Sequence, residues 1–235
     1  MTNTRVHAPV RRRRTLAATS RATNALPRQF AWTALALLLS LMAVGCVEVQ
    51  QRQVEVTPGA VPDELQGARW QSLPASYCIV ADDRGFVAAE RFVELTIEAF
   101  ERWGVAATYD GPCSEATAGN GRNEIAWGSP DDASRNHPEG GAYQVGWTKL
   151  VFRQCPSGCP GGAKTEITEA DILILPSPPE EFQTEECLFT SLLHEAGHFF
   201  GVQHLESPAV MAPASDDCAQ RLTPADVDAI EVLYR

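Results

Sequence analysis

The first 46 residues contain no aspartate or glutamate, although they contain seven arginines. The whole chain has 19 lysines and arginines against 30 aspartates and glutamates. Because seven of the basic residues lie in the first 46, 12 basic and 30 acidic residues remain beyond them, a net charge of −18. Such a surface repels nucleic acid and anionic lipid headgroups, so we exclude both as binding partners.

The sequence also lacks internal repeats, low-complexity tracts and any apolar run long enough for a stable membrane span. Its longest apolar run, in FAWTALALLLSLMAVGC (residues 30–46), has about 15 apolar residues and follows the basic segment. A basic flank before a short apolar run is typical of an export signal. MAVGC resembles the lipobox of bacterial lipoproteins, in which Cys46 would be lipidated, although Ala43 stands where leucine is usual. The alternative is an uncleaved membrane anchor. Either way we expect an exported protein, as an envelope lipoprotein or a secreted one.

Cysteine is sparse, and without Cys46 six cysteines remain. An even number in an exported chain predicts three disulfides, and the sequence alone leaves all pairings open. The pattern CPSGC at residues 155–159 has no partner pair at zinc-knuckle spacing, so a disulfide that closes this loop is the better interpretation.

The remaining chain divides into a spacer at residues 47–74, which contains three prolines, and one domain at residues 75–235. Apolar periodicity predicts helices at residues 86–103, 186–200 and 223–234. Short apolar runs between turn-forming residues predict strands at 77–80, 105–109, 123–128, 142–152 and 166–175. This order of elements indicates a single α/β domain.

Histidine is scarce too, and three of the five histidines lie within HEAGHFFGVQH (residues 194–204). Residues four apart on a helix project from one face, so His194 and His198 can share one ion. His204 cannot join them from an unbroken helix, because six further residues carry it about 9 Å along the axis. Gly201 stands where the helix must break, since glycine enters the left-handed conformation at little cost. The spacing predicts a zinc ion held by three imidazoles, with a fourth position open to water.

Glu195 adjoins the first of these histidines and can reach a zinc-bound water without binding the ion. Zinc lowers the pKa of such a water and polarises a carbonyl group. A carboxylate in this position can take the proton of the water and pass it to a leaving amine. The alternatives are a chance motif and a structural zinc site, but a structural site usually closes its fourth position with cysteine. We therefore predict hydrolysis with Glu195 as the general base.

The stretch from His194 to His204 has the form HExxHxxGxxH, which resembles the signature of the metzincin zinc peptidases. The segment SPAVMAP places Met211 where the Met-turn of that clan lies. Three stretches are similar to the active-site helix, the Met-turn and the last helix of the matrixins: CLFTSLLHEAGHFFGVQH, AVMAP and LTPADVDAIEVLY. The resemblance implies a zincin-like α/β (α+β) fold over residues 75–235. It would have a twisted, mostly parallel five-stranded sheet with an antiparallel edge strand, three helices and a zinc cleft.

The same resemblance implies how a peptide would bind. AYQVGW (residues 142–147) would form the edge strand at the rim of the cleft, to which an extended peptide adds as a further strand. Pro213, Ala214 and Ser215 would line the pocket for the side chain after the scissile bond. Ala212 and Ser215 stand where many matrixins have tyrosine, so the shape of that pocket is not carried over.

Within this framework we expect a disulfide that ties the active-site helix to the segment below the metal, and two others. The three pairs are Cys187–Cys218, Cys155–Cys159 and Cys78–Cys113. The cysteine switch of the matrixin pro-domain is missing, because residues 47–74 contain no cysteine.

We expect one catalytic zinc ion, because only His137 matches the histidine-rich loop that binds a second, structural zinc in vertebrate matrixins. Acidic residues offer candidate calcium ligands, with simple solvation as the alternative. These candidates are Asp131, Asp132 and the stretch from Glu166 to Asp171.

The sequence therefore predicts an exported, monomeric, zinc-dependent endopeptidase that acts on proteins or peptides. One alternative is a catalytically idle metzincin domain that binds peptides, and the intact Glu195 argues against it. The other is a structural envelope lipoprotein with a chance motif, which a metal assay would test.

Overall fold

The computed structural model describes residues 51–56, 65–129, 145–155, 158–159, 163–213, 218 and 221–235. All of them belong to one compact unit, Glu48–Arg235. The predicted export signal and Cys46 lie outside the described residues. Within the described part of the chain, no helix has the length and apolar character needed to cross a bilayer.

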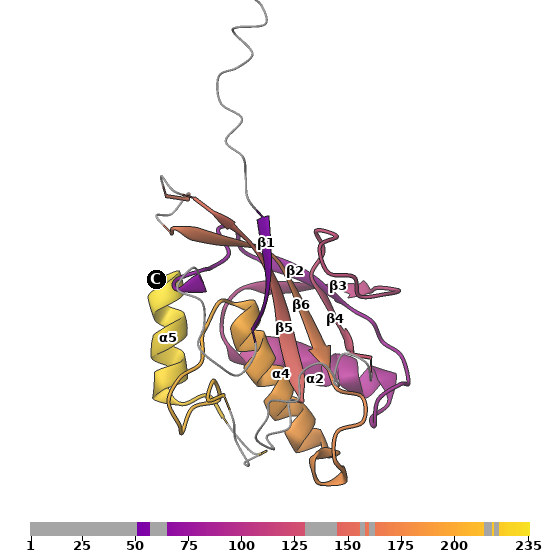
Figure 1. The fold of residues 1–235 in the computed structure, drawn as a ribbon. Helices are drawn as coiled ribbons and strands as arrows, with labels where there is room; N and C mark the ends of the chain where they lie inside the picture. Colours follow the sequence, from indigo (N-terminus) through magenta and orange to yellow (C-terminus); the bar gives the residue numbers. More distant parts are fainter. Residues whose placement is uncertain are drawn as a thin grey trace, which may run out of the picture. The chain divides into compact units, whose positions relative to one another are not determined.

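A mixed sheet in the order β1-β5-β6-β4-β2-β3 forms the centre of the unit (Figure 1). Four strands run parallel, as predicted for most of the sheet: β2 (Ala75–Ile79), β3 (Ala107–Pro112), β4 (Glu124–Trp127) and β6 (Thr165–Ile174). Antiparallel to them is β5 (Gly146–Gln154), which pairs with β6. These five strands confirm the predicted sheet.

A sixth strand, β1 (Gln51–Val56), extends the sheet beyond the five that were predicted. It lies within the segment that the sequence assigns to a spacer, and it pairs with β5 in antiparallel register. The strand β5 therefore has neighbours on both sides along residues 148–153, and β1 forms that edge of the sheet. Short polar strands of this kind have too weak a period to separate from a spacer in the sequence.

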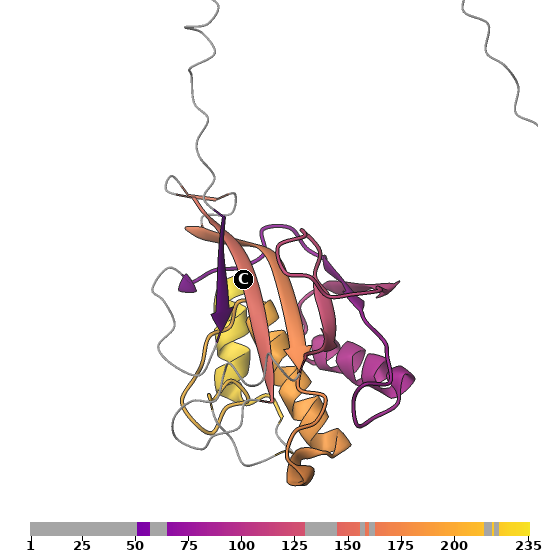
Figure 2. The ribbon, with the colours of Figure 1, turned by 45° about the vertical axis from the view of Figure 1, so that its right-hand side comes forward.

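Three α-helices lie where the sequence predicts them: α2 (Ala89–Arg102), α4 (Glu185–Phe199) and α5 (Pro224–Tyr234). A short 3-10 helix, η2 (Glu180–Phe182), precedes α4. Figure 2 shows α2 and α4 beside each other along the sheet, and the indole N–H of Trp103 donates to the Leu193 carbonyl at 2.8 Å. The hydrophobic core lies between these helices and the sheet, with Phe92, Phe100 and Phe199 at its centre.

Helices α4 and α5 each begin at a residue whose side chain caps the first turn. The Thr184 side chain accepts a hydrogen bond from the Cys187 N–H and so starts α4. In α5, Thr223 and Asp226 form a capping box and Pro224 occupies the first turn. These local signals begin each helix at a defined residue, which sets where the side chains of α4 point.

Residues 65–74 pack against the domain, although the sequence analysis places them in the spacer. Leu65 and Ala68 are fully buried in the core. The Trp70 ring lies 5.4 Å from the Phe199 ring in a tilted arrangement, and its Nε1–H donates to the Phe199 carbonyl at 2.8 Å. The packed unit therefore includes residues before Ala75, and part of its N-terminal segment supports the end of α4.

Candidate metal centre

Helix α4 presents His194 and His198 one turn apart, because four residues make slightly more than one helical turn. Their Nε2 atoms lie 3.1 Å from each other. The helix has no Pro or β-branched run in this half, and Leu192, Leu193 and Ala196 bury its other side in the core. The two imidazoles are thus fixed by a helix that is itself held by packing.

Gly201 ends the helix where the sequence predicts a break. Its φ is +93°, in the left-handed region, and a Cβ here would lie 2.1 Å from the carbonyl oxygen of Ala68. Both the backbone conformation and the close approach require glycine. The turn brings the Val202 carbonyl back over the helix, where it lies 2.8 Å from His198 Nδ1.

His204 follows this turn and completes the group. Its Nε2 lies 3.1 Å from His198 Nε2, and the ligand atoms of His194, His198 and His204 all lie within 4.8 Å of one another. Two nitrogens bound at 2.0–2.1 Å in tetrahedral geometry are about 3.3 Å apart, so the observed spacing suits zinc. The structure therefore brings together all three histidines that the motif predicts.

The backbone decides which nitrogen of two of these rings carries the proton. His194 Nδ1 lies 2.7 Å from the Val210 carbonyl, and His198 Nδ1 lies 2.8 Å from the Val202 carbonyl. A carbonyl can only accept, so each Nδ1 donates, and each neutral ring keeps a lone pair on Nε2. At 3.1 Å, two such lone pairs face each other with no hydrogen between them, an arrangement that a cation stabilises.

Enclosure by the protein keeps these rings neutral. Burial lowers the pKa of His194 to about 4, against which the Val210 carbonyl raises it. Burial also lowers the pKa of His198 well below its usual range and lowers that of His204. Neutral imidazole is the form that binds zinc, so the histidines are ready to bind the ion at neutral pH.

Glu195 is buried beside the histidines and held by a partner from the sheet. The Thr148 hydroxyl lies 2.7 Å from Glu195 Oε2 and 3.1 Å from the Glu195 carbonyl oxygen. Gly146 leaves room for this carboxylate, since a Cβ there would lie 3.0 Å from Glu195 Cγ and 3.2 Å from Oε1. The sequence analysis did not identify Thr148 or Gly146, because only strand β5 brings them against the helix.

Met211 is fully buried below the histidines. Its Sδ occupies the space that a Cβ on Gly197 of α4 would need, with 2.3 Å between the two positions. The Met211 carbonyl accepts a hydrogen bond from the Leu205 N–H at 2.9 Å, which joins this turn to the residue after His204. The predicted Met-turn residue thus lies against both the helix and the segment of the third histidine.

Asp226 holds this turn from below and was missed as a site residue. Its fully buried carboxylate accepts hydrogen bonds from the backbone N–H groups of Val210 and Met211, both at 3.1 Å. It also accepts from the N–H and the hydroxyl of Thr223. In the sequence, an aspartate in the first turn of a helix is explained by its local role at the helix start. That explanation gave no reason to expect a contact with the Met-turn.

The structure joins the six cysteines in the three expected pairs: Cys78–Cys113, Cys155–Cys159 and Cys187–Cys218. Of the predicted pocket, Pro213 is exposed next to the buried Ala212, while Ala214 and Ser215 lie outside the described residues. The same holds for Asp131, Asp132 and His137, and for the first three residues of AYQVGW.

Two further groups of metal-binding residue types occur in the described part of the chain. Each contains a pair of disulfide-bonded cysteines, with Glu124 in one and Glu166 in the other. Disulfide sulfurs are not thiolates and do not bind zinc as cysteine does. Only the histidine group among these three offers free ligands.

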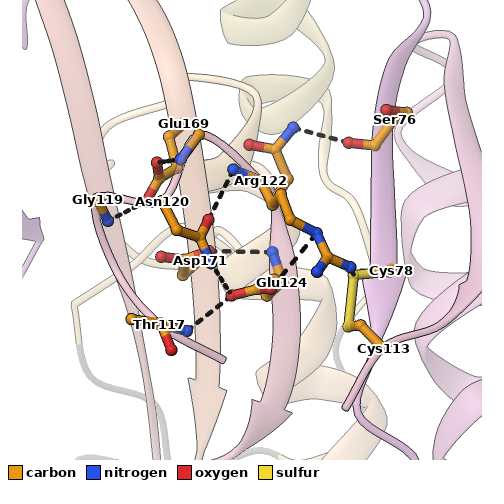
Figure 3. A network of polar contacts seen from close by, with 12 residues as sticks. Ser76, Cys78, Cys113, Thr117, Gly119, Asn120, Arg122, Glu124, Glu169 and Asp171 are labelled. Carbon is orange, nitrogen blue, oxygen red and sulfur yellow. Dashed lines mark hydrogen bonds and ion pairs between the residues drawn. A yellow bond between two sulfur atoms is a disulfide. The ribbon is translucent and has the colours of Figure 1, made fainter. Parts of the chain in front are cut away.

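A buried carboxylate cluster lies on the sheet around Glu124, Glu169 and Asp171 (Figure 3). Backbone N–H groups of Gly119 and Gly121 donate to Glu169, and the N–H of Thr117 donates to Glu124 at 2.7 Å. Of the candidate calcium ligands, Glu169 is therefore bound by protein donors. Likewise, Glu166 pairs with Arg153. None of the three groups of potential metal ligands found among the described residues consists of carboxylates alone.

Within this cluster the Glu124 N–H donates to Asp171 Oδ1 at 3.0 Å. Burial, together with the nearby Glu169 and Glu124 carboxylates, raises the pKa of Asp171 to about 7 against the lowering effect of that hydrogen bond. The cluster therefore holds a proton under conditions in which an exposed aspartate would be ionised.

Comparison with known proteins agrees with the motif. The family model described as Peptidase_M10: Matrixin matches residues 69–235, which include all of the histidine site, Met211 and Asp226. A search of curated proteins finds no match.

Proposed function

The chain belongs to the matrixin family, and we propose that it is a zinc-dependent endopeptidase in which Glu195 is the general base. The family supports a zinc metallopeptidase that acts on proteins or peptides. The proposal goes further and assigns the zinc ligands as His194, His198 and His204 and the base as Glu195. All four belong to one chain, so one copy supplies the whole site.

One observation carries this proposal. Nε2 of His198 lies 3.1 Å from the Nε2 atoms of both His194 and His204, although the backbone carbonyls assign the protons of His194 and His198 to Nδ1. A structural role for histidine would place a donor against an acceptor. Converging lone pairs instead fit a cation.

When bound, zinc would lower the pKa of a water and polarise the substrate carbonyl. The residues of the chain supply the rest. Glu195 accepts a proton from the attacking water and returns it to the leaving amine. The Thr148 hydroxyl donates to Glu195 Oε2 and limits its rotation, so the other carboxylate oxygen keeps a defined direction. Met211, beneath the helix, keeps the histidines in place by packing against Gly197.

The test uses the full chain, correctly oxidised, on a library of random peptides. Wild type should contain one zinc per chain and cleave peptides, and a chelator should abolish cleavage. Glu195→Gln should keep the zinc and lose activity by at least about 100-fold. Glu186→Gln provides the matched control, because Glu186 is exposed on the same helix.

Cleavage that survives both the chelator and Glu195→Gln would rule out the mechanism. A metal-free wild-type protein would rule out the zinc site. An intact zinc site without any cleavage would favour a peptide-binding domain instead.

We also propose that residues 1–46 direct export and that Cys46 carries a lipid. The basic flank, the short apolar run and the three disulfides of the domain support this assignment. Mass spectrometry of the mature N-terminus would test it, with Cys46→Ser as the control. A chain that starts upstream of Cys46, or a Cys46 without lipid, would contradict the lipoprotein assignment.

A further inference from the structure

Strand β1 covers part of the sheet edge that leads to the proposed active site. Its six residues pair with Thr148 to Arg153 of β5 in antiparallel register, from Gln51 opposite Arg153 to Val56 opposite Thr148. Figures 1 and 2 show β1 alongside β5 at one edge of the sheet. The backbone groups on that side of these β5 residues are therefore engaged within the chain.

The last pair of this ladder lies beside the proposed base. Thr148, opposite Val56, is the residue whose hydroxyl lies 2.7 Å from Glu195 Oε2. The next inward-facing residue of β5 is Gly146, which borders the Glu195 side chain. Gly146 and Trp147 pair with Ile174 and Leu173 of β6, and within the described part of the chain β1 ends at Val56, opposite Thr148. Two described residues of β5, Gly146 and Trp147, thus lie between the start of that strand and the part that β1 covers.

We propose that β1 is a fixed stop that limits how much of a peptide substrate pairs with β5 on the N-terminal side of the scissile bond. This inference rests on the proposed function. A peptide that adds to the same edge in the direction of β1 runs antiparallel to β5, so its N-terminal end faces Val56. We place the scissile bond opposite Gly146, because this residue borders Glu195. At a strand rise of about 3.4 Å per residue, about two substrate residues then fit between that bond and β1. The enzyme would therefore recognise substrates mainly through the residues C-terminal to the scissile bond. It would cleave bonds that lie close to a free N-terminus, or just after a sharp turn of the substrate chain.

This arrangement predicts an asymmetric dependence on peptide length. Each residue that pairs with a strand edge adds backbone hydrogen bonds and improves kcat/KM about fivefold. In the wild-type protein the gain should end after about two residues N-terminal to the cleaved bond. Removal of β1 from the edge should extend the gain to the third and fourth residues.

The experiment uses a peptide that the full-length protein cleaves in the library, prepared with one to five residues before the cleaved bond. Two double variants disrupt the ladder in alternate positions: Arg52→Pro with Val54→Pro, and Gln53→Pro with Glu55→Pro. Alternate residues of a strand direct their N–H groups to opposite sides, so only one pair of substitutions removes donors to β5. The other is its matched control. Hydrogen exchange of residues 148–153 identifies which variant has released the edge.

A cross-link provides an independent variant. Glu55 and Lys149 are directly opposite each other, so Glu55→Cys with Lys149→Cys can hold β1 in place. We expect the cross-linked protein to keep wild-type activity and the wild-type length profile. Loss of cleavage on cross-linking would show that β1 must leave the edge, and would overturn the proposal in favour of an inhibitory strand.

The length profile decides the remaining outcomes. The proline variant with faster exchange at residues 148–153 should gain about fivefold from a third residue, while the other variant should not. A wild-type protein that already gains from the third and fourth residues would overturn the inference and leave the proposed function intact. The same conclusion would follow if the released variant kept the wild-type profile. Absence of cleavage in every variant would overturn the proposed function itself.

Discussion

The hydroxyl of Thr148 lies 2.7 Å from Oε2 of Glu195, and it joins a sheet residue to the proposed base on the active-site helix. The same hydroxyl lies 3.1 Å from the Glu195 carbonyl, so it contacts both the side chain and the backbone of that residue. Thr148 is itself fully buried, which protects these hydrogen bonds from competition with water.

Thr148→Val should therefore lower kcat about tenfold with little change in KM, because the shape of the site is kept while Glu195 loses its positioning partner. Steady-state kinetics on a cleaved peptide would measure this, and zinc content should not change. Thr148→Ser should restore most of kcat, since it restores the hydroxyl. Equal losses in the serine and valine variants would contradict a positioning role.

Asp226→Ala should lower the free energy of unfolding by about 3 kcal/mol, because it leaves the N–H groups of Val210 and Met211 buried without an acceptor. It should also weaken zinc binding, since the Val210 carbonyl orients His194. Chemical denaturation and zinc titration would measure the two effects. Asp228→Ala, at an exposed position of the same helix, should change neither.

Gly201→Ala should destabilise the protein by about 3 kcal/mol, because alanine must adopt a positive φ and its Cβ meets the Ala68 carbonyl. Gly67→Ala is the matched control. Its φ is +72°, but no atom lies within 4 Å of the new Cβ, so we expect a cost of about 1 kcal/mol. If urea denaturation gave the same loss of unfolding free energy for both variants, the contact with Ala68 would not contribute to the effect of Gly201→Ala.

Asp171→Asn should change how stability depends on pH. Burial raises the pKa of Asp171 to about 7 in the folded protein from 3.8 when exposed. Between these values the folded state holds a proton that the unfolded chain has lost, so this group lowers the free energy of unfolding as pH rises from about 4 to 7. The contribution is constant above that window.

The asparagine variant lacks this loss. Its free energy of unfolding relative to wild type should therefore rise by a few kcal/mol between about pH 4 and 7 and then level off. Denaturation in urea at several pH values would measure the difference. A difference that is the same at every pH would show that folding does not change the pKa of Asp171.

Leu65→Ala should cost about 3 kcal/mol, because Leu65 is 0% exposed within the core although it lies in the segment expected to be a spacer. Leu73→Ala is the control from the same segment, and its 42% exposure predicts a change within about 0.5 kcal/mol. Thermal and urea denaturation of the two variants would show whether the unit begins before Ala75.

The elements and the core of the site could be read from the sequence because their signals are local. Two histidines four residues apart on a helix share one face whatever surrounds them, and a glycine three residues later favours a break after the second histidine. Thr223, Pro224 and Asp226 likewise start α5 through contacts within one turn. For this reason the helix and strand predictions are confirmed, with small shifts at their ends.

Contacts between segments far apart in the chain could not be predicted from such local patterns. Thr148 and Glu195 are 47 residues apart, and only the packing of β5 under α4 brings them together. Asp226 reads as a helix cap until the Met-turn folds against it, and β1 reads as part of a polar spacer until it pairs with β5. A spacing of a few residues determines a ligand set through the geometry of one helix. The residues that support the histidines and Glu195, and the part of β5 that β1 leaves uncovered, depend on packing between distant segments. No short sequence pattern encodes such packing.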